Sequence, residues 1–157
     1  MNEGPICPIS FYSDQLEINC TVPGKPFAKQ RPRASRRGRY TTVYTPKETI
    51  EYENLVKYSY FEQTGGMMLD GPLEAEILGT FPIPQSVSKK QMIAMLNGEV
   101  YHTKKPDCDN MAKSVLDALN GVAYHDDSQI VKLYVNKQYG EIPSVQITLR
   151  ELLSRKE

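Results

Sequence analysis

Two aspartates, Asp107 and Asp109, stand two residues apart directly after Pro106. Proline disfavours a helical conformation in the residue before it, here Lys105, so we expect no helix to run through Pro106. Asp107 should then lie on an extended segment that leads into a helix beginning at Asp109. On such a segment both carboxylates can face the same way. Two further aspartates, Asp126 and Asp127, stand just before a predicted strand. Carboxylates that converge from these places would repel one another unless a cation lay between them.

The oxygen ligands of this acidic cluster are typical of a site for Mg²⁺, with Mn²⁺ as the alternative ion. A few carboxylates hold such an ion together with waters and substrate phosphates. A D-x-D motif also occurs in Mn²⁺-dependent glycosyltransferases, but their catalytic domains are usually larger than 157 residues. We expect Cys108 to point into the core, because a hard cation does not favour a thiol. We interpret His102 and His125 as surface residues, with His125 able to reach a substrate.

Each of these residues also has a purely structural interpretation, which the sequence leaves open. Asp109 can serve as the N-cap of the helix. Lys113 follows it by four residues, one helical turn further on, and can pair with Asp109 or with Asp117. Asp126 and Asp127 can be ordinary turn residues.

A strongly basic segment precedes the acidic cluster. Between Glu17 and Glu48 the sequence has no acidic residue, and its prolines and glycines predict an extended loop. The arginines suit contact with phosphates, and the interleaved aromatic residues Phe27, Tyr40 and Tyr44 favour nucleic acid as the partner. A solvated, flexible loop is the alternative. We call residues 24–44 the basic arm; the basic residues between the two glutamates are Lys25, Lys29, Arg31, Arg33, Arg36, Arg37, Arg39 and Lys47.

Composition bounds the class of protein. The chain has 157 residues, 19 basic and 19 acidic side chains and a formal net charge of zero, and 39% of its residues are hydrophobic. These values predict one folded domain and exclude disorder. The absence of a membrane span, a signal peptide and a disulfide framework adds the expectation of a cytoplasmic location. No apolar run approaches the roughly 18 residues of a membrane span, and the first residues lack the pattern of a signal peptide. Three cysteines without C-x-x-C spacing argue against disulfides and zinc.

The elements that must position these side chains follow from periodicity and capping signals. Alternation predicts strands at 15–22, 73–82, 130–138 and 144–149. Whether the strand at 73–82 has a hairpin partner stays open. Helices are predicted from a capping box at 45–48 to about residue 63, before two glycines; from Ser88 to about Asn97; and from Asp109 to Asn120, before Gly121. The order predicts a two-layer α/β (α+β) domain with a mixed sheet and helices on one face.

The motifs together resemble the RusA family of Holliday junction resolvases, in the longer form found in phages, prophages and Gram-positive bacteria. The central resemblance is Lys105-Pro106-Asp107-Cys108-Asp109-Asn110-Met111-Ala112-Lys113, then Asp117-Ala118-Leu119-Asn120-Gly121, then Asp126-Asp127-Ser128-Gln129-Ile130. In the basic arm, Gly24-Lys25-Pro26 and Lys29-Gln30-Arg31-Pro32-Arg33 are also similar to the family. The resemblance covers about residues 15 to 150.

This resemblance implies a Mg²⁺-dependent endodeoxyribonuclease that acts as a homodimer and resolves four-way junctions by paired symmetric nicks in DNA recombination and repair. Asp107, Asp109 and Asp127 would be the essential metal-binding carboxylates. Asp126 is a fourth candidate ligand that would neighbour the site, and Lys113 would stabilise charge on the phosphate or orient a carboxylate. The residues that would bind the DNA backbone are Lys25, Lys29, Arg31, Arg33, Arg36, Arg37 and Arg39.

The resemblance also divides the chain into an N-terminal extension (1–14), a RusA-like domain (15–150) and a C-terminal tail (151–157). Two other functions stay open. The first is a DNA-binding module of the same fold without catalysis, against which the intact set of aspartates and Lys113 argues. The second is a nuclease that acts mainly on other branched DNA, for which the same site would serve.

Overall fold

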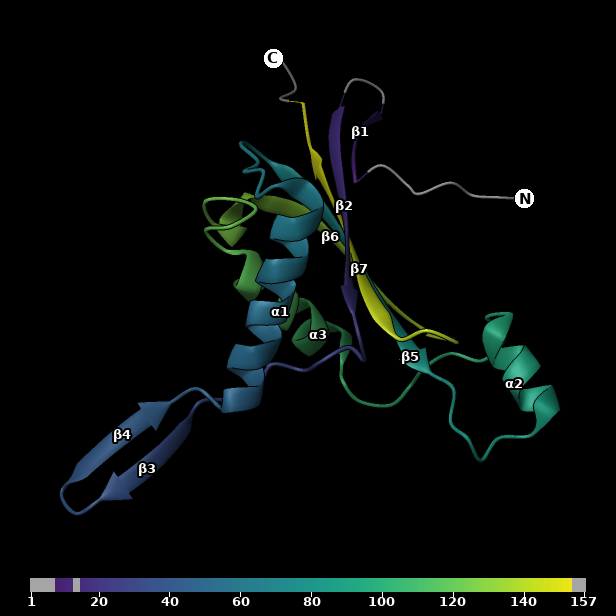
Figure 1. Ribbon diagram of the computed structural model, residues 1–157, viewed down its shortest axis with the longest axis horizontal. Helices are drawn as coiled ribbons and strands as arrows, with labels where there is room; N and C mark the ends of the chain where they lie inside the picture. Colours follow the sequence, from purple (N-terminus) through teal and green to yellow (C-terminus); the bar gives the residue numbers. More distant parts are fainter. Residues whose placement is uncertain (1–7, 13–14, 154–157) are drawn as a thin grey trace.

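The computed structural model describes residues 8–12 and 15–153. Within these residues, five strands form a mixed sheet in the order β1-β2-β7-β5-β6, and two form a separate hairpin (Figure 1). The strands are β1 (Ile9–Tyr12), β2 (Gln15–Pro23), β3 (Arg33–Arg37), β4 (Tyr40–Tyr44), β5 (Leu73–Pro82), β6 (Ile130–Gly140) and β7 (Ser144–Glu151). The helices are α1 (Lys47–Thr64), α2 (Lys89–Leu96) and α3 (Cys108–Leu119), and a 3-10 turn, η1, spans Asp127–Gln129.

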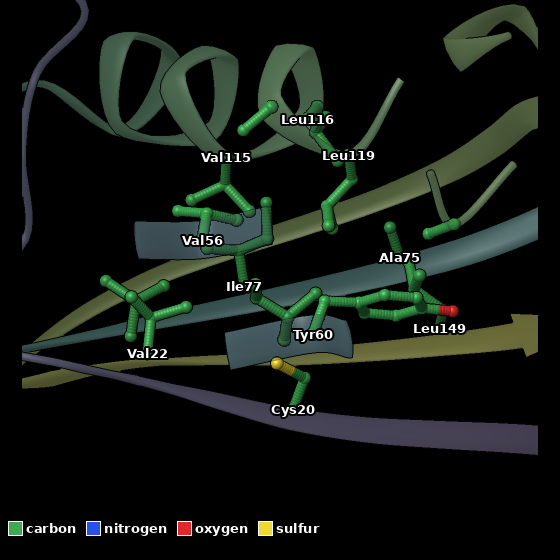
Figure 2. Close-up of a cluster of buried hydrophobic side chains, with 14 of the residues drawn as sticks. Cys20, Val22, Val56, Tyr60, Ala75, Ile77, Val115, Leu116, Leu119 and Leu149 are labelled. Atoms are coloured by element: carbon green, nitrogen blue, oxygen red, sulfur yellow. The ribbon is translucent and has the colours of Figure 1, made fainter. Parts of the chain in front are cut away.

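The core lies between one face of the sheet and the helices α1 and α3 (Figure 2). Because side chains alternate along a strand, every second residue is buried on this face over residues 18–22 of β2, 73–81 of β5 and 145–149 of β7. The apolar faces of the two helices pack against these strand residues and include Val56, Tyr60, Val115 and Leu119. Each such buried side chain contributes roughly 1.5–3 kcal/mol. The predicted two-layer α+β domain with a mixed sheet is confirmed.

The four predicted strands are all present, but the pairing of β5 was not predicted. It has no hairpin partner: β5 pairs antiparallel with β7 and parallel with β6. A parallel pair needs a long crossover, and the segment that carries α2 and α3 supplies it. The start of β6 therefore lies beside the start of β5, with Ile130 opposite Leu73. This arrangement brings the turn before β6 back to the helical face of the sheet.

The helix boundaries confirm some capping predictions and correct others. Ser88 is the N-cap of α2, as predicted, and forms a capping box with Gln91. The helix α1 ends at Thr64, directly before the C-cap Gly65, whose φ of 69° is left-handed. The capping box predicted at the start of α1 is wrong. Pro46 is itself the N-cap, with φ −55° and ψ 143°, and no side chain caps the helix. Since Pro46 is extended, helical geometry begins one residue later than the pattern suggested.

The basic arm is not the extended loop that the sequence predicted. Its second half is the hairpin of β3 and β4, which extends away from the rest of the domain (Figure 1). Gly38, with φ 63°, lies in the two-residue turn between the strands and supplies the backbone conformation that such turns need. All ten strand residues are exposed.

The segment before residue 15 contributes β1, an edge strand paired with β2, to which the sequence analysis assigned no element. Residues 1–7, 13–14 and 154–157, with Cys7 and most of the predicted tail, lie outside the described residues. The boundaries of the extension and the tail stay predictions. Among the described helices, none combines the length and the apolar character that crossing a membrane requires.

Candidate active site

The start of α3 places the two aspartates of the D-x-D motif differently from each other. Asp107 is the N-cap residue, with φ −69° and ψ 154°, so it is extended as predicted. Asp109 is not the cap but lies inside the first turn of α3. A negative charge there is favoured by the helix dipole. The interpretation of Asp109 as an N-cap is therefore wrong, and its carboxylate is left for another role.

A surface pocket of about 540 Å³ brings together three of the predicted site residues: Asp109, Lys113 and Asp127. Asp109 and Lys113 come from successive turns of α3, and Asp127 comes from η1, just before β6. Asp107 and Asp126 are not among the lining residues. The remaining lining residues are Asp117, Ala112, Leu116, Leu133 and Val135. The pocket thus combines charged groups with an apolar wall.

Lys113 faces this pocket without an internal partner. Its side chain is exposed, and in residues 8–12 and 15–153 it makes no ion pair. Asp117, which the sequence analysis considered as its partner, pairs with Lys29 instead, at 2.6 Å. The helix-pairing interpretation of Lys113 therefore finds no support in the described part of the chain.

The adjacent residues Asp126 and Asp127 have separate tasks. Asp126 caps η1, because its carboxylate accepts hydrogen bonds from the backbone N–H and the hydroxyl of Ser128. The hydrogen bond from the Ser128 side chain is the main reason why the pKa of Asp126 lies below its usual value. Asp127, the next residue, lines the pocket. The turn interpretation thus holds for Asp126, while Asp127 is the one that faces Asp109 and Lys113.

Gln129, which the sequence analysis did not single out, holds the turn that carries Asp127. Its side-chain oxygen accepts hydrogen bonds from the backbone N–H groups of His125 (2.8 Å) and Asp126 (3.1 Å). Its side-chain nitrogen donates to the carbonyls of Leu69 (3.3 Å) and Gly71 (3.0 Å). One amide therefore fastens η1 to the segment that leads into β5.

Lys137 of β6 holds the segment before Asp107 in a similar way. Its Nζ donates to the carbonyls of Lys104 (2.8 Å) and Pro106 (3.0 Å). The strand pattern contains a signal for this role. Lys137 shares its strand face with Val135 and Tyr139, and a charge on a largely apolar face needs a nearby polar partner.

Beneath the pocket, Tyr124 joins α3 to the loop that follows it. Its hydroxyl donates to the carbonyl of Leu116 at 2.6 Å, and its ring is fully buried. Burial, reinforced by the negative charges of Asp127 and Asp117, raises the pKa of Tyr124. Tyr124 is therefore a neutral hydrogen-bond donor that supports the site rather than an acid or base within it.

Two expectations about residues near the site are wrong. Cys108 is exposed rather than in the core, because it is the first residue of α3 and its side chain lies outside the helix–sheet contact. His102 is buried, with 7% of its surface exposed, and stacks on Phe81 with 3.7 Å between ring centroids. Burial, followed by the charge of nearby Lys137, lowers the pKa of His102. His125 is exposed as expected and lies 3.1 Å from Asp70.

The first part of the basic arm is fixed to the body of the domain. Lys29 Nζ lies 2.6 Å from Asp117 and 3.3 Å from Glu53. Ser114 of α3 donates a hydrogen bond to the carbonyl of Phe27 at 2.8 Å. Lys29 thus anchors the arm beside the pocket, and its assignment to DNA contact stays a prediction. The other basic residues assigned to DNA are exposed: Lys25, Arg31, Arg33, Arg36, Arg37 and Arg39.

The donor set of the pocket fits a hard divalent cation. Among the described residues, no group of three His, Cys, Asp or Glu side chains is arranged as a metal site. The pocket does present the carboxylates of Asp109 and Asp127, and Asp107 stands one residue before α3. Mg²⁺ is usually held by one or two carboxylates, with waters and substrate phosphates as its other ligands. Three carboxylates line the pocket, without a thiol or an imidazole. Asp117 is paired with Lys29, so Asp109 and Asp127 are the two carboxylates that remain to meet this requirement.

Comparison with known proteins gives the family of the chain. Residues 23–150 match the sequence model of the family described as "Endodeoxyribonuclease RusA". An uncharacterized protein of Bacillus subtilis (strain 168), YqaN, is 36% identical over 137 residues, which make up 86% of this chain and 96% of YqaN. The span matched by the family model, residues 23–150, contains the pocket, the turn that carries Asp127 and the whole of the basic arm.

Proposed function

The chain belongs to the RusA family of endodeoxyribonucleases, and on this basis we propose that it is a Mg²⁺-dependent enzyme that resolves four-way DNA junctions by paired symmetric nicks. The observation that carries the proposal is the pocket in which Asp109, Lys113 and Asp127 meet. The carboxylates of Asp109 and Asp127, beside an ammonium group that pairs with no described residue, suit metal-assisted hydrolysis of a phosphodiester: they offer ligands for a cation and a positive charge for the phosphate.

Each side chain of the pocket has a task in this proposal. Asp109 and Asp127 would hold the cation, with Asp107 as the third candidate ligand. A bound divalent cation would supply an activated water and stabilise charge on the phosphate. Lys113, one turn along α3, would face the phosphate and stabilise the negative charge that grows in the transition state.

Outside the pocket, the basic arm would supply contacts with the DNA backbone. Such contacts position the protein without reading bases, which suits an enzyme that selects shape. Two symmetric nicks require two symmetric sites, and a two-fold homodimer provides them. The proposal therefore includes a homodimer in which each protomer cuts one strand.

Cleavage of a synthetic four-way junction beside a linear duplex of the same sequence tests this function. Each DNA is incubated with Mg²⁺, with Mn²⁺ and with a chelator, and the nicks are mapped on both strands. We expect symmetric nicks in the junction only, and only with a metal. Equal cutting of the linear duplex would refute junction selectivity, and cutting in the chelator would refute the metal dependence. A replication-fork substrate in the same series identifies a nuclease directed at other branches.

A further inference from the structure

The hairpin of β3 and β4 has two unequal faces. Side chains opposite each other in an antiparallel pair share a face. Tyr40 lies opposite Arg37, and Tyr44 lies opposite Arg33. Both pairs are on the same face, because the residues of each strand differ by four positions. We call this the Arg–Tyr face; between these pairs it carries Ser35 opposite Thr42, and the other face carries Ala34, Arg36, Thr41 and Val43.

The tyrosines of the Arg–Tyr face are exposed. Tyr40 exposes 81% of its surface and Tyr44 exposes 47%. Within the described residues the two strands pair only with each other, and Figure 1 shows the hairpin extending away from the sheet and the helices. A two-stranded hairpin is at best marginally stable alone, and aromatic rings left in water contribute little to holding it. The exposed tyrosines therefore make the Arg–Tyr face a candidate binding surface.

Charge identifies the occupant as a polyanion. The hairpin contains Arg33, Arg36, Arg37 and Arg39 and no acidic residue, in a chain whose net charge is zero. Each tyrosine of the Arg–Tyr face lies directly opposite an arginine, and the Cβ atoms of such a pair are about 5 Å apart. A nucleic acid offers phosphates to the arginines and flat bases to the tyrosines, which stack on bases of any sequence.

We propose that the Arg–Tyr face binds bases that are unpaired or unstacked at a DNA branch, with Tyr40 and Tyr44 stacking on them and the arginines holding the adjacent phosphates. This inference deepens the proposed function and rests on it. In a continuous duplex both faces of each base are covered by neighbouring bases, so a tyrosine ring finds no surface to stack on. At a branch the stack is interrupted. The two tyrosines, whose Cα atoms are about 13 Å apart along β4, would then distinguish branched from linear DNA.

The test measures binding without divalent metal, so that it does not depend on cleavage. The probes are a linear duplex and the same duplex with a two-base bulge that contains 2-aminopurine, whose fluorescence falls when an aromatic ring stacks on it. The variants are Tyr40→Thr/Tyr44→Thr, which keeps β-branched side chains in β4, and Tyr40→Phe/Tyr44→Phe, which keeps the rings. Val43→Thr is the matched control, because Val43 is 67% exposed on the opposite face.

We expect the wild type, the Phe variant and Val43→Thr to prefer the bulge and to quench its fluorescence. The Thr variant should lose at least about tenfold of that preference and the quenching, while its affinity for the linear duplex stays unchanged. The inference would be overturned if Val43→Thr lost as much of the preference for the bulge as the Thr variant does. It would also be overturned if the Thr variant kept the preference and the quenching of the wild type. A change of the Thr variant from dimer to monomer in light scattering would also overturn the inference, because the Arg–Tyr face would then bind a second copy of the chain rather than DNA. Failure of the proposed function appears separately, as an uncut four-way junction with the wild type.

Discussion

At the scale of single residues, the structure separates neighbours that look equivalent in the sequence. Asp126 and Asp127 are adjacent, yet the first caps a turn and the second lines the pocket with Asp109. We predict that Asp127→Asn abolishes cleavage, because it removes one of the two carboxylates that would hold the cation, while junction binding persists. Asp126→Asn should keep most of its activity, since Asn caps as well as Asp. Single-turnover cleavage beside a band-shift assay measures both. Equal inactivation of the two variants would contradict this division of tasks.

Lys113 provides the second prediction at this scale. Because it makes no ion pair among the described residues, Lys113→Met should leave the melting temperature nearly unchanged. It should slow cleavage at saturating Mg²⁺ on the order of 100-fold or more, since a charge that stabilises the transition state is gone. Lys29→Met is the control: it leaves Asp117 without its partner and should lower the melting temperature. A Lys113→Met enzyme that cuts at the wild-type rate would remove Lys113 from the site.

At the scale of elements, the geometry of the site depends on the hydrogen bonds that hold two segments, the one before α3 and the turn η1. Lys137 holds the segment before α3, and Gln129 holds η1. We predict that Gln129→Ala raises the Mg²⁺ concentration needed for half-maximal cleavage, because Asp127 is no longer held in place. The unpaired backbone groups should also cost on the order of 1 kcal/mol of stability. A titration of rate against Mg²⁺, beside a thermal melt, measures this. A melt that changes without any change in the Mg²⁺ titration would show that Gln129 only stabilises the fold.

At the scale of the whole molecule, the balance of charge decides how the protein meets DNA. The net charge is zero, so we expect attraction to DNA to come from a local patch, and we propose the basic arm as that patch. We predict that replacing Arg33, Arg36, Arg37 and Arg39 with Ala reduces the slope of log K against log salt, by roughly 0.9 for each phosphate that is no longer neutralised. The control is Lys89→Ala/Lys90→Ala on α2, at the other side of the domain in Figure 1. An unchanged slope in the arginine variant would mean that the hairpin is only solvated.

The sequence by itself determined the elements whose signals are local. Alternating side chains predicted β2, β5, β6 and β7, because a strand with one buried face must repeat every two residues. The acidic motif and Lys113 were also readable, since their spacing alone puts Asp109 and Lys113 one helical turn apart. The hairpin was missed because Arg33–Arg37 has no buried face, so its sequence shows no apolar alternation.

Only the tertiary structure decided which distant residues meet. Lys29 reaches Asp117 across 88 positions, and Gln129 reaches Leu69 across 60. No local pattern encodes such contacts, because they arise from the parallel pairing of β5 with β6 and from the packing of α1 against α3. The same packing places the side chain of Asp127, and not that of Asp126, in the lining of the pocket. Spacing along the chain therefore determined which chemistry is available, and the long-range pairing of the sheet determined which side chains are close enough to perform it.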